Sequence, residues 1–283
     1  MKNKQLDQLN YHELFDEFNY SFMDVQKEFY NLKNLIIELS QLCVNTIKNK
    51  GRVFYVGAGT SGRIAMLDSL DILPTFGEYN WFKYAMAGGQ QAILKSLEGY
   101  EDDFELGKKD AKKFKINQND LIIGLSASGN TRYVNGFFVF AKEVFAKTVL
   151  ISNQDSGLCL QNTDLALISH LEPEIIDGST RLKSATLQKM ILNTISSTTA
   201  IKLGKVYNNY MIDLTPINEK LVKRSINIIQ KITNLSFEDA NNLYKKANKN
   251  IKIAIIMFFK QVDFIDAKKL LKEFKNNLRD IIG

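Results

Sequence analysis

Short apolar runs alternate with longer segments of helical periodicity through the middle of this chain. The runs are rich in β-branched and aromatic residues and predict buried strands at 53–56, 81–87, 120–125, 147–152 and 166–169. Helical spacing follows from Arg63 onward and then at 90–97, 132–146 and 184–203, whereas 111–119 is polar and predicts a loop. Strands that alternate with helices of this length predict the α/β class, with a parallel sheet sandwiched by helices.

Both ends of the chain depart from this alternation. From Asp7 to Lys50 apolar positions recur at helical spacing, which predicts one or two amphipathic helices. From about Asn218 several helical segments follow one another with no strand between them. We therefore expect N-terminal helices at 1–50, a sheet domain at 51–216 and a small all-helical C-terminal unit at 217–283.

Three loops of small residues are expected between a strand and a helix: GAGTSGR (57–63), SASGNT (126–131) and GSTRLK (178–183). In the first, Thr60 and Ser61 occupy positions typical of N-caps. Ligands of parallel sheets bind beyond the carboxyl ends of the strands, where these loops collect. Free N–H groups and the helix dipole make such places anion sites.

The three loops differ in what they indicate. GAGTSGR fits neither the dinucleotide fingerprint nor a P-loop. A tight strand-to-helix connection that binds no ligand is therefore an open alternative for this loop. SASGNT is a neutral, hydroxyl-rich nest of the kind that binds a phosphate monoester, with an ordinary capped loop as the alternative. In GSTRLK, Arg181 and Lys183 either reach an anion or are solvated.

Composition excludes several classes of protein. The chain has 283 residues, 45% of them hydrophobic and 24% charged, which is typical of a globular fold. Its net charge of +6 is spread over polar faces, which favours solvated helices over nucleic-acid binding. No run approaches the roughly 18 apolar residues of a membrane helix, and the N-terminus lacks a signal-peptide core. Cys43 and Cys159 match no metal or redox spacing, so we expect buried thiols in a cytoplasmic protein.

Acidic residues gather in two places. Asp68 and Asp71 are three apart and share roughly one face of the helix after the glycine turn. Four more lie close together in the segment EGYEDD, at Glu98, Glu101, Asp102 and Asp103. From spacing alone such a cluster is usually solvated. An isolated histidine is more often structural than functional, and we expect this of His12 and His170.

Five motifs, in order, resemble one known family. They are VGAGTSGRIAMLDSLDILPTFG, AGGQQAILKSLEGYEDD, GLSASGNTRYV, PEIIDGSTRLKSATLQKMILN and LGKVYNNYMIDL. They closely resemble N-acetylmuramic acid 6-phosphate etherases of the sugar-isomerase (SIS) domain superfamily, and the resemblance covers 51–283. It implies a lyase that eliminates D-lactate from C3 of the ring-opened sugar and then adds water, without a metal or organic cofactor.

The resemblance also implies site residues and partners. It places the two catalytic acids at Glu101 and at Asp71, where the family has a glutamate. The loops are expected to bind a small-molecule sugar phosphate through Gly59, Thr60, Ser61, Ser126, Ser128, Gly129, Asn130, Thr131, Ser179 and Lys183. A cytoplasmic homodimer of amino-sugar catabolism and peptidoglycan recycling is expected, with no nucleic-acid or membrane partner. Two alternatives stay open: a non-catalytic sugar-phosphate-binding regulator, and a sugar-phosphate isomerase that uses His170 or a glutamate as base.

Overall fold

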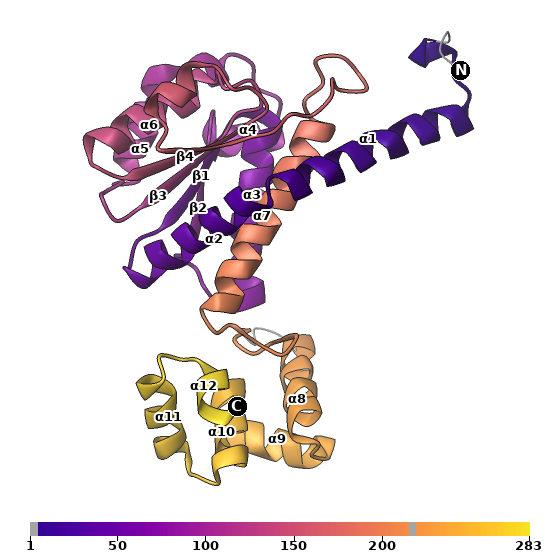
Figure 1. Ribbon diagram of the computed structural model, residues 1–283. Helices are drawn as coiled ribbons and strands as arrows, with labels where there is room; N and C mark the ends of the chain where they lie inside the picture. Colours follow the sequence, from indigo (N-terminus) through magenta and orange to yellow (C-terminus); the bar gives the residue numbers. More distant parts are fainter. Residues whose placement is uncertain (1–4, 215–218) are drawn as a thin grey trace. The chain divides into compact units, whose positions relative to one another are not determined.

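The computed structural model describes residues 5–214 and 219–283, and these fall into two compact units (Figure 1). The first unit comprises residues up to 69 together with 80–196, and the second comprises 70–79 and 197–283. The expected boundary at 216–217 falls outside the described residues, and the three-part division stays a prediction. Among the described helices, none combines the length and apolarity that spanning a membrane requires.

The first unit is built on a five-stranded parallel sheet with strand order β2-β1-β3-β4-β5. The strands are β1 (Val53–Gly57), β2 (Phe82–Met86), β3 (Leu121–Leu125), β4 (Lys147–Ser152) and β5 (Leu165–Ile168). The predicted parallel sheet and all five of its strands are confirmed. The apolar runs located them because strands covered on both faces are apolar at nearly every position.

Helices cover both faces of this sheet (Figure 1). On one face, Phe54 and Val56 join a buried cluster with Phe137 and Phe138 of α6 (Arg132–Glu143). On the other face, Tyr55 lies near Asp68 of α3 (Gly59–Phe76), and α2 (Lys33–Lys48) contacts β1 and β3. The alternation of side chains along β1 therefore serves two helical layers.

The remaining helices of this unit agree with the sequence except in one place. They are α1 (Tyr11–Asn31), α4 (Gly89–Leu94), α5 (Phe104–Lys113) and α7 (Lys183–Lys202). The expectation of a loop at 111–119 is wrong for its first three residues, because α5 runs through Lys113. Asp103 begins this helix by accepting a hydrogen bond from the Leu106 N–H at 2.8 Å.

The α5 and α6 helices are in backbone contact. A methyl group on Gly107 would lie 2.1 Å from the Tyr133 carbonyl oxygen, and one on Gly136 would lie 2.0 Å from that of Phe104. Two glycines therefore permit the close packing of the helix pair. Cys43 and Cys159 are both buried thiols, as expected, and burial raises the pKa of Cys159 to about 12.

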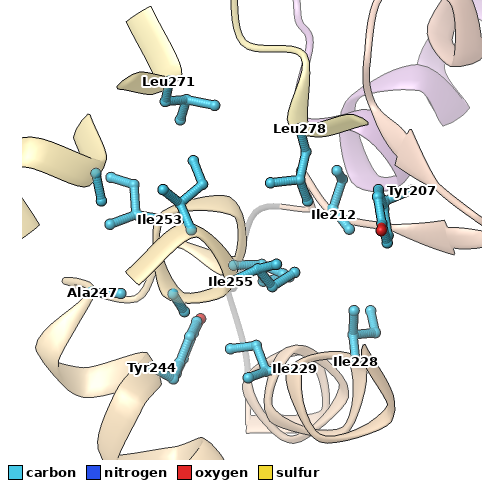
Figure 2. Close-up of a cluster of buried hydrophobic side chains, with 14 of the residues drawn as sticks. Tyr207, Ile212, Ile228, Ile229, Tyr244, Ala247, Ile253, Ile255, Leu271 and Leu278 are labelled. Carbon is cyan, nitrogen blue, oxygen red and sulfur yellow. The ribbon is translucent and has the colours of Figure 1, made fainter. Parts of the chain in front are cut away.

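The second unit contains helices and a small antiparallel hairpin that the sequence did not predict, β6 (Val206–Tyr207) with β7 (Tyr210–Met211). Its helices are α8 (Glu219–Thr233), α9 (Phe237–Lys246), α10 (Ile251–Lys260), α11 (Phe264–Glu273) and α12 (Leu278–Ile282). Figure 2 shows their shared core, in which Ile255 of α10 lies among side chains that include Ile229 and Tyr244.

In the second unit Lys252 is buried, and its ammonium donates to Asp213 at 2.7 Å. Burial outweighs that carboxylate and lowers the pKa of Lys252.

Candidate functional site

In the first loop only Ala58 separates β1 from α3, because the strand ends at Gly57 and the helix begins at Gly59. The Gly62 N–H donates to the Ala58 carbonyl at 3.1 Å, so Thr60 and Ser61 lie in the first turn of the helix. Their expected role as N-caps is therefore wrong. Their backbone N–H groups are instead among those at the helix start that lack intrahelical partners. A methyl group on Gly62 would lie 2.7 Å from Met86 Cγ, so the glycine lets α3 start against β2.

The second loop, Ser126 to Thr131, is held rigidly at the end of β3. The hydroxyls of Ser126 and Thr131 lie 2.8 Å apart, and Ser126 is buried. The Gly129 N–H donates to the Ser126 carbonyl at 3.1 Å, which closes a turn. Gly129 has a φ of +68°, and a methyl group there would lie 2.7 Å from the Ser156 carbonyl oxygen. Only glycine fits this position, and the turn leads directly into the start of α6.

A cavity of about 410 Å³ lies beside this loop. It is lined by Ser128 and Asn130, by Asn153 and Gln154 after β4, by Glu174 in the segment before α7 and by Ser184 in the first turn of α7. The Ser128 side chain is exposed, and its hydroxyl accepts the Asn130 N–H at 3.2 Å. The cavity combines hydroxyl and amide groups at the carboxyl ends of β3 and β4 with the carboxylates of Glu172 and Glu174. It has the polarity and the place in the sheet that a phosphorylated sugar requires.

The third loop, 178–183, has its polar groups occupied by other parts of the chain. The Lys183 ammonium is buried and lies 2.7 Å from Asp24 Oδ2 on α1. The Glu174 carboxylate accepts the backbone N–H groups of Lys183 at 2.8 Å and Ser184 at 3.0 Å. Ser179 forms a local turn through its backbone. For Lys183 to bind a phosphate, as the sequence predicts, its buried ammonium would have to reach the anion with N–H groups that do not donate to Asp24.

Glu101 lies on the short 3₁₀ turn η2 (Tyr100–Asp102), which follows the edge strand β2 in the chain. It lines a cavity of about 60 Å³ together with Glu98, Gly59 and Arg63. Arg63 holds the end of α4, because its Nη2 donates to the carbonyls of Ala92 at 2.9 Å and Lys95 at 3.2 Å. The structure therefore brings Glu101 and the glycine turn together. Arg63 was not among the site residues predicted from the sequence, although it stands within GAGTSGR.

The other candidate residues lie elsewhere. Asp71 has an exposed side chain and lies near the end of α3, within the segment 70–79 that belongs to the second unit. Asp68 is buried, accepts the Ser196 hydroxyl at 3.3 Å and lies 3.7 Å from the Lys189 ammonium. The His170 ring is exposed, while its backbone N–H donates to Glu28 at 2.7 Å. Asp68 is thus integrated into the core, and the roles of Asp71 and Glu101 stay predictions.

The strand order and the loops at the carboxyl ends of β1 and β3 define a sugar-isomerase-type domain. Residues 35–142 match the family model of the glucokinase regulatory protein N-terminal SIS domain. The fold is shared with phosphoheptose isomerases of 16–17% sequence identity. The one from Francisella tularensis has a TM-score of 0.54 and aligns over 68% of this chain and all of that chain. The one from Neisseria gonorrhoeae has a TM-score of 0.50 over 66% and 98%.

Sequence relatives narrow the class to a family. The N-acetylmuramic acid 6-phosphate etherase of Pseudothermotoga lettingae is 43% identical over 86% of this chain and 82% of its own length. That of Staphylococcus epidermidis is 38% identical over all of this chain and 96% of its own. The chain belongs to the N-acetylmuramic acid 6-phosphate etherase family, which confirms the resemblance of the five motifs.

Proposed function

We propose that this protein is an N-acetylmuramic acid 6-phosphate etherase. It is a carbon–oxygen lyase that converts its substrate to N-acetylglucosamine 6-phosphate and D-lactate. The observation that carries the proposal is the extent of the match, since a relative with this name aligns with the whole chain at 38% identity. The hydroxyl-rich loop beside a polar cavity of about 410 Å³ supports it, because it offers a place for a sugar phosphate.

The phosphate is held at the start of α6. Ser126, Ser128, Gly129, Asn130 and Thr131 present hydroxyl and backbone groups there, and the helix dipole favours the anion. Gly59, Thr60 and Ser61 contribute the start of α3 at the neighbouring strand. Ser179 and Lys183 belong to the proposed site through the loop before α7. Binding energy from the phosphate, which does not react, positions C2 and C3 for the chemistry.

The reaction proceeds from the open-chain aldehyde. The aldehyde acidifies the C2 proton, and Glu101 removes it as general base. The electron pair forms the C2–C3 double bond while the C3–O bond to the lactyl group breaks. Asp71 gives its proton to the departing ether oxygen, which yields D-lactate and an α,β-unsaturated aldehyde. Water then adds across the double bond, with its oxygen on C3, to give the product.

The experiment that tests this function follows both products. Purified protein is incubated with N-acetylmuramic acid 6-phosphate, and D-lactate and N-acetylglucosamine 6-phosphate are measured together. Equal release of the two is expected. Saturable binding of the substrate without lactate release would instead indicate a regulator. Interconversion of aldose and ketose phosphates would indicate an isomerase.

The protein acts as a cytoplasmic homodimer in peptidoglycan recycling and amino-sugar catabolism. The exposed aromatic side chains of α1, which include Tyr11, Phe15 and Tyr30, support an association of two copies. Its division into 1–50, 51–216 and 217–283 belongs to the same proposal. Light scattering of the purified protein tests the dimer directly, and a monomeric mass at micromolar concentration would contradict it.

A further inference from the structure

Arg63 has hydrogen-bonding capacity that the fold does not use. It lies on the second turn of α3 with a half-buried side chain, and its two hydrogen bonds both leave from Nη2, to Ala92 and Lys95. In residues 5–214 and 219–283, neither Nε nor Nη1 has a hydrogen-bond partner, and no carboxylate lies within 4 Å of the guanidinium. Arginine is always charged, so this side chain brings a positive charge to which no carboxylate of the described residues is paired within 4 Å.

That charge borders the small cavity that Glu101 also lines. Among the described residues around this cavity, Arg63 is the one cation, whereas Glu98 and Glu101 bring negative charge. The larger cavity beside Ser128 is lined by no arginine or lysine among the described residues. The cation therefore lies at the β1–β2 edge of the sheet, apart from the loop to which the phosphate is assigned.

The proposed substrate carries a second anion. Its lactyl group bears a carboxylate and is attached to C3, the neighbour of the carbon from which Glu101 removes a proton. When Glu101 reaches C2, the lactyl group must lie close to Glu101. A cavity of about 60 Å³ has room for a group of a few heavy atoms, such as a carboxylate.

The sheet places the two anion-binding positions close enough together for one ligand to reach both. Gly57 of β1 is the partner of Leu125 of β3 in the parallel ladder, so the loops after these strands are neighbours. Adjacent strands lie about 5 Å apart. A sugar with its phosphate over the start of α6 can therefore extend its C3 substituent toward α3.

We propose that Arg63 binds the lactyl carboxylate through its Nε and Nη1 N–H groups. It thereby selects 3-O-lactyl sugar phosphates over sugar phosphates that lack the acid. This inference rests on the proposed etherase function. A charge-assisted hydrogen bond of this kind is among the stronger polar contacts in a protein.

The test compares charged and neutral ligands in the wild-type protein and in Arg63→Met. The ligands are N-acetylmuramic acid 6-phosphate, its lactyl amide, and N-acetylglucosamine 6-phosphate as a competitive inhibitor. We expect Arg63→Met to raise KM for the acid about tenfold to hundredfold. The inhibition constant of the product should change less than threefold, and the preference for the acid over the amide should be lost. Lys95→Met, which removes an exposed charge from the same segment, should leave all three values unchanged.

Two results would overturn the proposal. One is an equal weakening of the acid, the amide and the product in Arg63→Met, which would assign Arg63 to holding the segment of Ala92 and Lys95. The other is an unchanged preference for the acid over the amide. Absence of lactate release from the wild-type protein would instead contradict the proposed function, so the two failures are distinguishable.

Discussion

Glu174 caps Ser184 twice: its Oε1 accepts the Ser184 backbone N–H at 3.0 Å and the Ser184 hydroxyl at 2.7 Å. The start of α7 is thereby bound to a carboxylate of the chain itself, and the helix dipole favours this arrangement. The Ser184 hydroxyl also accepts the Asn153 amide at 2.5 Å. One glutamate thus holds α7 and the loop after β4 together at the wall of the larger cavity.

Glu174→Gln should weaken this capping. The amide keeps the shape but loses the charge, so we expect the free energy of unfolding in urea at pH 7 to fall by about 1–2 kcal/mol. Asp177→Asn is the control, because Asp177 is exposed in the same segment and its carboxylate has no partner in the described part of the chain. Equal stability of the two variants would contradict the assigned role of Glu174.

Ser128 and Ser179 should differ as phosphate ligands. Ser128 lines the larger cavity at the start of α6, whereas the start of α7 near Ser179 is occupied by Glu174. Ser128→Ala should raise KM for the sugar phosphate about tenfold, the equivalent of one hydrogen bond to a charged group. Ser179→Ala should raise it less. Steady-state kinetics on both variants measures the difference, and a larger effect at Ser179 would move the phosphate to the third loop.

Asp71 is predicted to protonate the departing ether oxygen. Asp71→Asn should therefore lower kcat by about 10²- to 10⁴-fold, the usual contribution of general acid catalysis, with little change in KM. Asp71→Glu introduces the glutamate that the resemblance to the etherases implies at this position, and it lengthens the side chain by one methylene. Single-turnover rates of lactate release compare the three proteins. Wild-type activity in Asp71→Asn would remove this residue from the mechanism.

Gly136→Ala should destabilise the first unit. The added methyl group would lie 2.0 Å from the Phe104 carbonyl oxygen, so α5 and α6 would have to separate. We expect a loss of about 1–3 kcal/mol in the free energy of unfolding, measured by thermal and urea denaturation. Lys109→Ala on the exposed face of α5 is the control and should stay within about 0.5 kcal/mol of the wild-type protein. An unchanged stability of Gly136→Ala would refute the close packing of the two helices.

The sheet could be predicted because its strands are buried on both faces. Residues such as Val53, Phe54 and Ile122 form continuous apolar runs, and the small-residue loops mark the strand ends. Helix α5 was hidden by its polar composition and by Gly107 in its interior, although Asp103 was a visible N-cap. The hairpin of β6 and β7 was missed because strands of two residues are too short to show a period.

The loops of the candidate site could be predicted from the sequence, whereas the side-chain contacts between distant residues could not. Ser126 to Thr131 carried a local signal, since hydroxyls and a glycine between strand and helix suit an anion. The pairing of Lys183 with Asp24 joins residues 159 apart in the chain, and no spacing rule connects them. The same holds for Arg63, whose bonds to Ala92 and Lys95 depend on how α3 packs against α4.

Removal of the C2 proton by Glu101 is the step on which the proposed etherase reaction depends. Its most direct test is D-lactate release from N-acetylmuramic acid 6-phosphate by the wild-type protein and by Glu101→Gln. Circular dichroism and product binding verify that the variant is folded. We expect release by the wild-type protein and a loss of at least about 10²-fold in Glu101→Gln. Wild-type rates in the variant, or no lactate from the wild-type protein, would contradict it.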